Sequence, residues 1–135
     1  MAEGFVTRSV LIGAGAGDVW DALVDPSRLE DWFADEVDTA AGELVAEAEV
    51  VFRWGDGTER VGVVEEVDAP RRLTLGWAQD GGEQSTVEFE LTEESAGTRV
   101  TVIERGLTVR AAAGRAVAWG PRLSGLRLTS CAVLA

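Results

Sequence analysis

The side chains of this chain that could do chemistry are carboxylates, guanidiniums and hydroxyls. The sequence contains 24 Asp and Glu and 12 Arg, but no His, Lys, Tyr or Asn, and Cys131 is its one thiol. A Ser-His-Asp triad and a Cys-His pair therefore lack their base, and a pyridoxal phosphate enzyme lacks its lysine. Zinc sites of the Cys/His type cannot form within one chain. We expect no metal and no cofactor.

The Gly-rich string from Gly13 to Asp18 lies between a predicted strand and a predicted helix. Asp18 stands where a dinucleotide fingerprint needs its third Gly, and its carboxylate would face a pyrophosphate. This string therefore predicts a strand-to-helix turn rather than a nucleotide site.

Two glutamates stand at informative strand positions. Glu104 continues an alternating run of valines, so an ideal strand would point it inward, where a carboxylate needs a partner such as Arg122 or takes a raised pKa. Glu65 shares the parity of two valines, although a bulge would turn it outward. Both residues could equally be strand-end side chains that reach solvent.

Large rings form the second group of candidate residues, with five Trp and four Phe but no Tyr. Most of them lie on faces expected to point inward, where they could line a cavity for a flat or greasy ligand. The apolar residues expected at that cavity are Trp20, Trp32, Phe33, Phe52, Trp54, Leu75, Trp77, Val87, Phe89, Val102, Trp119, Leu123 and Leu126. Glu104 or Arg122 would orient a polar end of the ligand. For any single ring, ordinary core packing is the alternative.

The elements that must position these residues begin with a strand over 5–12 and a helix over 18–24. A second short helix is expected to open at Ser27, which has the Ser-x-x-Glu capping spacing. From about residue 43 the apolar period changes to two. The strands expected in this part start with the alternation of Val50 to Trp54 and continue over 58–67, 72–78, 85–92 and 98–105. Gly120-Pro121 predicts the start of a final amphipathic helix, and the Ala- and Gly-rich segment 108–118 before this start is a candidate for motion.

This order of elements favours an α+β domain in which an antiparallel sheet has one apolar face covered by the last helix. No repeat, low-complexity tract or linker divides the sequence, so residues 1–135 are expected to form one domain. A long helix against a strongly curved sheet is expected to leave a cavity.

The net charge of −12 disfavours nucleic acid and anionic membrane surfaces as partners. Residues 95–135 nevertheless hold six Arg and a single acid, Glu104, which favours self-docking or an acidic ligand. No apolar run approaches the roughly 20 residues that cross a bilayer, so no membrane insertion is expected. With one Cys and no evident leader, we expect a cytoplasmic protein, either a monomer or a homodimer.

Several ordered motifs carry a resemblance to a known family. They are Asp18–Pro26, Leu29 with Trp32-Phe33, Gly62–Leu73 with Trp77, Ser85–Leu91, Gly97–Val100 and Trp119-Gly120. Over nearly its whole length the chain resembles the activator of heat-shock protein 90 ATPase homologue-like proteins, which lie within the START-like (SRPBCC, polyketide cyclase-related) helix-grip superfamily. It departs from that pattern at residues 15–17, where Gly-Ala-Gly replaces the usual Pro- and Glu-containing helix start.

The resemblance implies a START/Bet v-like fold, in which a curved sheet grips the C-terminal helix around an apolar cavity. Its relatives bind lipids, sterols, polyketides or plant hormones, and a minority are cyclases or dehydratases. We expect non-catalytic binding of a lipid, aromatic or polyketide-like molecule. Two alternatives are a cyclase- or hydrolase-like enzyme in which a buried Glu104 or Glu65 moves protons, and a co-chaperone-type protein-interaction module.

Overall fold

The computed structural model describes residues 3–79 and 84–132. In chain order its elements are β1 (Glu3–Ile12), α1 (Ala16–Val24), α2 (Pro26–Trp32), β2 (Glu36–Asp38), β3 (Glu49–Arg53), β4 (Glu59–Asp68), β5 (Arg72–Gln79), β6 (Gln84–Glu94), β7 (Gly97–Thr108) and α3 (Val109–Ala132). None of the helices in these two ranges has both the length and the apolar character needed to cross a membrane.

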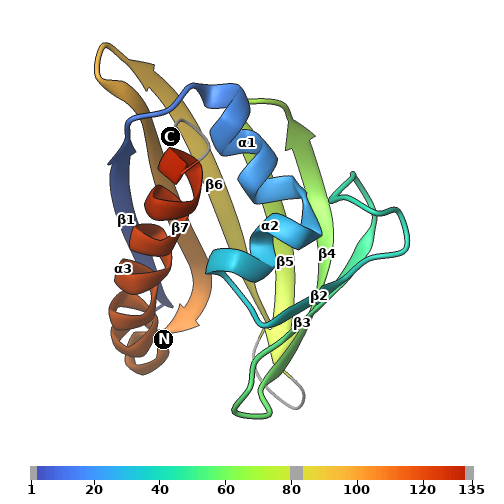
Figure 1. Cartoon of the computed structure of the whole chain (residues 1–135). Helices are drawn as coiled ribbons and strands as arrows, with labels where there is room; N and C mark the ends of the chain where they lie inside the picture. Colours follow the sequence, from blue (N-terminus) through green and yellow to red (C-terminus); the bar gives the residue numbers. More distant parts are fainter. Residues whose placement is uncertain (1–2, 80–83, 133–135) are drawn as a thin grey trace.

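The strands form one seven-stranded sheet in the order β1-β7-β6-β5-β4-β3-β2. Each neighbouring pair is antiparallel, so β2 to β7 form a meander and β1 pairs with the last strand. The sheet curves, and the three helices lie on its concave side, with α3 crossing β1 and β7 (Figure 1). The α+β helix-grip architecture predicted from the sequence is confirmed.

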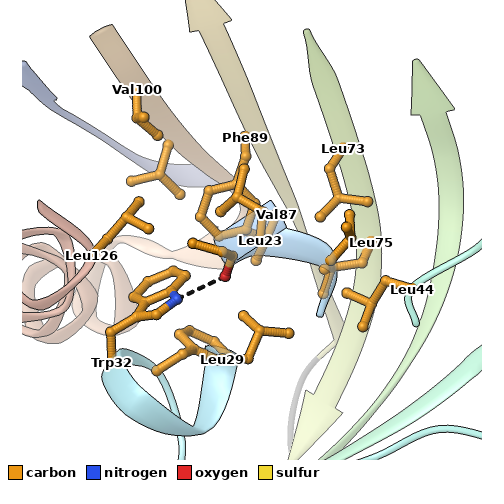
Figure 2. Packing of buried hydrophobic residues seen from close by; sticks show 14 of the residues in the cluster. Leu23, Leu29, Trp32, Leu44, Leu73, Leu75, Val87, Phe89, Val100 and Leu126 are labelled. Atoms are coloured by element: carbon orange, nitrogen blue, oxygen red, sulfur yellow. Dashed lines mark hydrogen bonds between the residues drawn. The ribbon is translucent and has the colours of Figure 1, made fainter. Parts of the chain in front are cut away.

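The core forms where the inward faces of the strands meet the helices. Along β6 the alternate residues Val87, Phe89 and Leu91 are buried, as the period of two predicts. In Figure 2 Val87 and Phe89 point toward the helices, as do Leu73 and Leu75 of β5, and meet Leu23, Leu29, Trp32 and Leu126 there. The Trp32 indole nitrogen donates a hydrogen bond of 2.9 Å to the Ala22 carbonyl, which fixes α2 against α1 (Figure 2).

The last helix begins much earlier than predicted. It starts at Val109 rather than at Gly120-Pro121, so most of the segment expected outside the helix belongs to it. Pro121 lies inside the helix but is exposed, and Ala112, Trp119, Leu123 and Leu126 pack one face of the helix on the core. Their packing outweighs the helix-breaking tendency of Pro, because tertiary burial supplies most of the stability of helices in proteins.

The start of α2 also differs from the prediction. Asp25, not Ser27, is the N-cap, and its carboxylate accepts a 2.9 Å hydrogen bond from the Ser27 amide. Pro26 occupies the first helical position, where its fixed φ suits a helix and its missing N–H costs nothing. Glu30 does not close a capping box here, since its carboxylate accepts from the Val37 amide instead.

Candidate functional site

Glu104 lies at the centre of the region between the sheet and α3. It is on β7, opposite Val87 of β6 and Val6 of β1, and its exposed fraction is 0%. The inward direction follows from the strand alternation, since Val100 and Val102 on the same face are also fully buried. A carboxylate in this position requires several hydrogen-bond donors.

Four donors surround the Glu104 carboxylate. Its Oε2 accepts hydrogen bonds from Arg115 Nη1 at 2.7 Å, Ser85 Oγ at 2.6 Å and Trp77 Nε1 at 3.0 Å. Its Oε1 accepts a hydrogen bond from Trp119 Nε1 at 3.0 Å. The Ser85 hydroxyl also accepts from the Trp77 indole at 2.9 Å, so these groups form one network. The network joins β5, β6 and β7 to α3.

The ion-pair partner of Glu104 is Arg115 and not Arg122, the arginine expected from the sequence. Arg115 lies in the first half of α3, in the segment that was expected outside the helix. Because this segment is helical and packs on the sheet, it brings the guanidinium of Arg115 to the carboxylate.

The Glu104 carboxyl is held in its ionised form. Burial alone would raise its pKa, but the hydrogen bonds from Ser85, Trp119 and Trp77 and the positive charge of Arg115 outweigh burial and lower it. A group of this kind is a weak base and is charged at neutral pH. In this arrangement its two oxygens serve as acceptors for the four donors around it.

Two further arginines reach the same region. Arg60 of β4 is only 8% exposed, and its guanidinium carbon lies 4.7 Å from the centre of the Trp77 ring. Arg122 of α3 lies over Phe33 and Trp119, at 5.1 and 5.2 Å from their ring centres. Within the described part of the chain, the Nη1 atoms of Arg60 and Arg122 are buried and have no hydrogen-bond partner. We call Arg60, Arg115 and Arg122 the arginine cluster.

The arginine cluster carries more positive charge than Glu104 can offset. Burial, together with the charges of Arg115 and Arg122 and against the opposing charge of Glu104, lowers the pKa of Arg60 to about 10. Burial, followed by the charge of Arg115, also lowers the pKa of Arg122. A pKa near 10 still leaves Arg60 protonated at neutral pH, so three cations share one carboxylate.

Rings fill the space beneath these arginines. Phe33 stacks on Trp77 and on Trp119, with ring centres 5.6 and 5.8 Å apart, and Phe52 and Trp54 meet Phe33 edge-on. We call Phe33, Phe52, Trp54, Trp77 and Trp119 the aromatic cluster. These rings contact one another, so a ligand that reached them would have to displace side chains, Arg122 first.

The other apolar residues predicted at the site are part of the surrounding core. Trp20, Trp32, Leu75, Val87, Phe89, Val102, Leu123 and Leu126 are all at most 8% exposed. Phe89 connects this core to the aromatic cluster, because its ring meets Trp119 edge-on at 5.7 Å. Two open grooves of about 600 Å³ lie beside the β4–β5 turn and beside β2, rather than at the cavity expected between the sheet and α3, and none of the predicted residues lines them.

Glu65 does not join the site. A bulge between Val64 and Glu66 interrupts the pairing of β4 with β5, and Glu65 is exposed. The prediction that Val61 and Val63 lie on the inward face of β4 was also wrong, since they are 41% and 46% exposed. The sheet register turns the other face inward, because Gly62 pairs with the buried Trp77.

Arg60, Ser85 and Arg115 were missed from the sequence. Ser85 has the same parity as Val87 and Phe89 on β6, and this could have indicated its burial. The burial of Arg60 follows only from the register of β4 against β5. The contact of Arg115 with Glu104 follows only once α3 is known to begin at Val109. Among the described residues, no three His, Cys, Asp or Glu side chains gather as metal ligands would.

Comparison with known proteins places the chain in a family. The fold is similar to that of MLL2253 from Mesorhizobium loti, with a TM-score of 0.85 and 20% identity over 93% of this chain and 96% of that one. It is also similar to CalU16 from Micromonospora echinospora, with a TM-score of 0.76 and 23% identity over 96% and 85% of the two chains.

A third similar structure is DynU16, a protein of the dynemicin biosynthetic locus, with a TM-score of 0.82 and 25% identity over 91% of this chain. This chain spans 45% of the length of DynU16. No curated protein matches the sequence. The model of one protein family, however, matches residues 14–129, which is most of the chain. The chain therefore belongs to the family of Activator of Hsp90 ATPase homolog 1-like proteins.

Proposed function

We propose that this protein binds a small hydrophobic molecule, aromatic or acyl in character, between the curved sheet and α3, and that it does so without catalysis. The bound molecule would lie against the aromatic cluster, in place of side chains that now cover it. The family, whose relatives bind hydrophobic molecules, supports the same class of ligand.

The observation that carries this proposal is the position of Arg122. Its guanidinium lies over Phe33, Trp54 and Trp119, at 5.1 to 5.4 Å from their ring centres, and its Nη1 is buried without a partner. An apolar side chain would cover these rings without the cost of an unsatisfied buried donor. A long, flexible arginine can swing away instead and expose three ring faces to a ligand.

Trp54 lies where such a ligand would enter. It is half-buried, while the other four rings of the aromatic cluster are buried. Its indole nitrogen donates a 2.9 Å hydrogen bond to the Phe33 carbonyl, so the ring is held at the rim of the cluster.

The enzyme alternative has less support. It requires a carboxyl of raised pKa beside the ligand, but the pKa of Glu104 is lowered by its donors and Glu65 is exposed. The protein-interaction alternative requires a contiguous apolar patch. In the described residues the large exposed apolar side chains are spread over β1, the β2–β3 connection, β4 and α3.

A titration with the neutral dye N-phenyl-1-naphthylamine tests the proposal. We expect saturable binding of one dye per chain, seen as a rise in dye emission and as quenching of Trp fluorescence. Trp54→Leu should weaken binding at least about fivefold, since it removes the rim ring, whereas Phe5→Ala on the exposed face of β1 should not change it. Absence of saturable binding to the folded protein would contradict the proposal.

A further inference from the structure

We propose that the molecule bound at the aromatic cluster carries an acidic group, a carboxylate or a similar oxyanion, and that Arg60 and Arg122 bind it. This inference rests on the proposed function and specifies the chemical class of its ligand. It assigns the two arginines as the residues that select an anionic ligand over a neutral one of the same shape.

The first step is that Glu104 already accepts hydrogen bonds from four other donors and makes none with Arg60 or Arg122 in the described structure. A carboxylate offers about four lone-pair positions. Arg115, Ser85, Trp77 and Trp119 already donate to it, at distances between 2.6 and 3.0 Å. Arg115 is thereby paired with the one carboxylate of the site, and Arg60 and Arg122 have no such partner in the described structure.

The second step is that both remaining guanidiniums are short of an acceptor. Arg60 is 8% exposed, Arg122 is half-buried, and each has a buried Nη1 atom with no partner in the described structure. The aromatic rings beneath them provide cation–π contact but no hydrogen-bond acceptor. Buried donors of this kind are usually satisfied, so the site is incomplete with the protein's own groups alone.

The third step concerns charge. Arg60, Arg115 and Arg122 are three cations around the single carboxylate of Glu104, so their like charges repel one another, and this repulsion adds to burial in lowering the pKa of Arg60. An incoming anion would relieve this repulsion and accept from both free Nη1 groups. The planar guanidinium fork matches a carboxylate better than any neutral group does. A cationic ligand would add to the repulsion and is excluded.

Ring faces and free guanidiniums lie in direct contact, so a single ligand can use both. Arg122 lies over Phe33, Trp54 and Trp119, and Arg60 lies over Trp77. A flat or acyl body would take the ring faces while its acidic end stays with the guanidiniums. The class that fits is an aryl or acyl acid rather than a sterol or a neutral lipid.

Two dyes with one skeleton test this inference. 1-Anilinonaphthalene-8-sulfonate and N-phenyl-1-naphthylamine differ only by the sulfonate group. We expect the wild-type protein to bind the sulfonate at least about tenfold more tightly than the neutral dye, with one site per chain. Naphthoate should displace the sulfonate at a lower concentration than the neutral naphthalenemethanol does.

Substitutions test whether Arg60 and Arg122 cause the preference for the sulfonate dye over the neutral dye. Arg122→Gln and, separately, Arg60→Gln should weaken sulfonate binding about tenfold while changing neutral-dye binding less than about threefold. Arg127→Gln is the matched control, because Arg127 is an exposed arginine on the same helix. Thermal unfolding checks that each variant is folded, and the comparison of dyes on the wild-type protein needs no variant.

The outcomes separate the two proposals. If neither dye binds saturably, the proposed function fails. If both dyes bind the wild-type protein equally, or if Arg127→Gln weakens sulfonate binding as much as Arg60→Gln and Arg122→Gln do, the hydrophobic site stands and the acidic-ligand inference is overturned.

Discussion

Glu104 of β7 and Arg115 of α3 form a 2.7 Å ion pair in which the Glu104 side chain is fully buried and the Arg115 side chain is 18% exposed. This pair ties the last strand to the first half of the last helix. Because Ser85, Trp77 and Trp119 donate to the same carboxylate, the pair organises both the aromatic cluster and the arginine cluster.

Glu104→Gln should destabilise the fold strongly. The substitution keeps the shape of the side chain but removes the one negative charge among three buried or half-buried arginines. Removing one partner of a buried pair usually costs about 3–5 kcal/mol in the free energy of unfolding. Urea denaturation measures this loss. Glu94→Gln, which breaks the exposed Arg99–Glu94 pair, should change stability little, and equal losses in the two variants would contradict the prediction.

The stability of the protein should depend on pH through Glu104. Its pKa in the folded protein lies below the ordinary value of 4.5, so its contribution is complete above that value and is lost as pH falls through the lower, folded pKa. We expect the gap in unfolding free energy between wild type and Glu104→Gln to be constant near neutral pH and to narrow below about pH 4.5. A gap that stays constant down to pH 3 would show that the carboxylate is not preferentially ionised.

Two glycines should respond to Ala in opposite directions. Gly97 at the start of β7 has φ +142°, and a Cβ there would lie 2.0 Å from the Ile12 carbonyl oxygen. Gly97→Ala should therefore cost well over about 1 kcal/mol. Gly17 in the first turn of α1 has open space around it, so Gly17→Ala should stabilise the protein by about 0.5–1 kcal/mol.

Thermal unfolding compares the two glycine variants directly. A stabilising Gly97→Ala would show that the β6–β7 turn does not need its left-handed backbone. A destabilising Gly17→Ala would show that the Gly-Ala-Gly start of α1 serves more than the local turn.

The sequence was sufficient where the local pattern and the tertiary contacts agree. Val87, Phe89 and Leu91 alternate with polar residues, and the period of two alone placed them in the core. The inward direction of Glu104 followed from the same alternation. The order of strands and helices then limited the fold to a sheet with helices on one side, as observed.

The remaining features depend on contacts between distant segments. On β4, Val61 and Val63 look more suited to the core than Arg60 and Gly62, yet the pairing of Gly62 with Trp77 turns the valines outward. Arg115 stands in an Ala- and Gly-rich stretch that predicts no partner for it. The β4–β5 register places Arg60 in the site, and the packing of α3 on the sheet places Arg115 there. The local hydrophobic periodicity predicts neither the register nor this packing.

Ser85→Ala should reveal how the network sets the pKa of Glu104. The Ser85 hydroxyl donates to the carboxylate at 2.6 Å and accepts from the Trp77 indole at 2.9 Å, so its removal takes one bond from each group. We expect a loss of about 1–3 kcal/mol at neutral pH. Because this bond is one of those that lower the pKa of Glu104, the folded pKa in the variant should lie closer to the ordinary value, so the loss of stability on acidification should be smaller than in wild type and should end at a higher pH. Ser95→Ala, at an exposed serine in the β6–β7 turn, is the matched control. If the two variants share one pH profile, the indoles and Arg115 hold the carboxylate without help from Ser85.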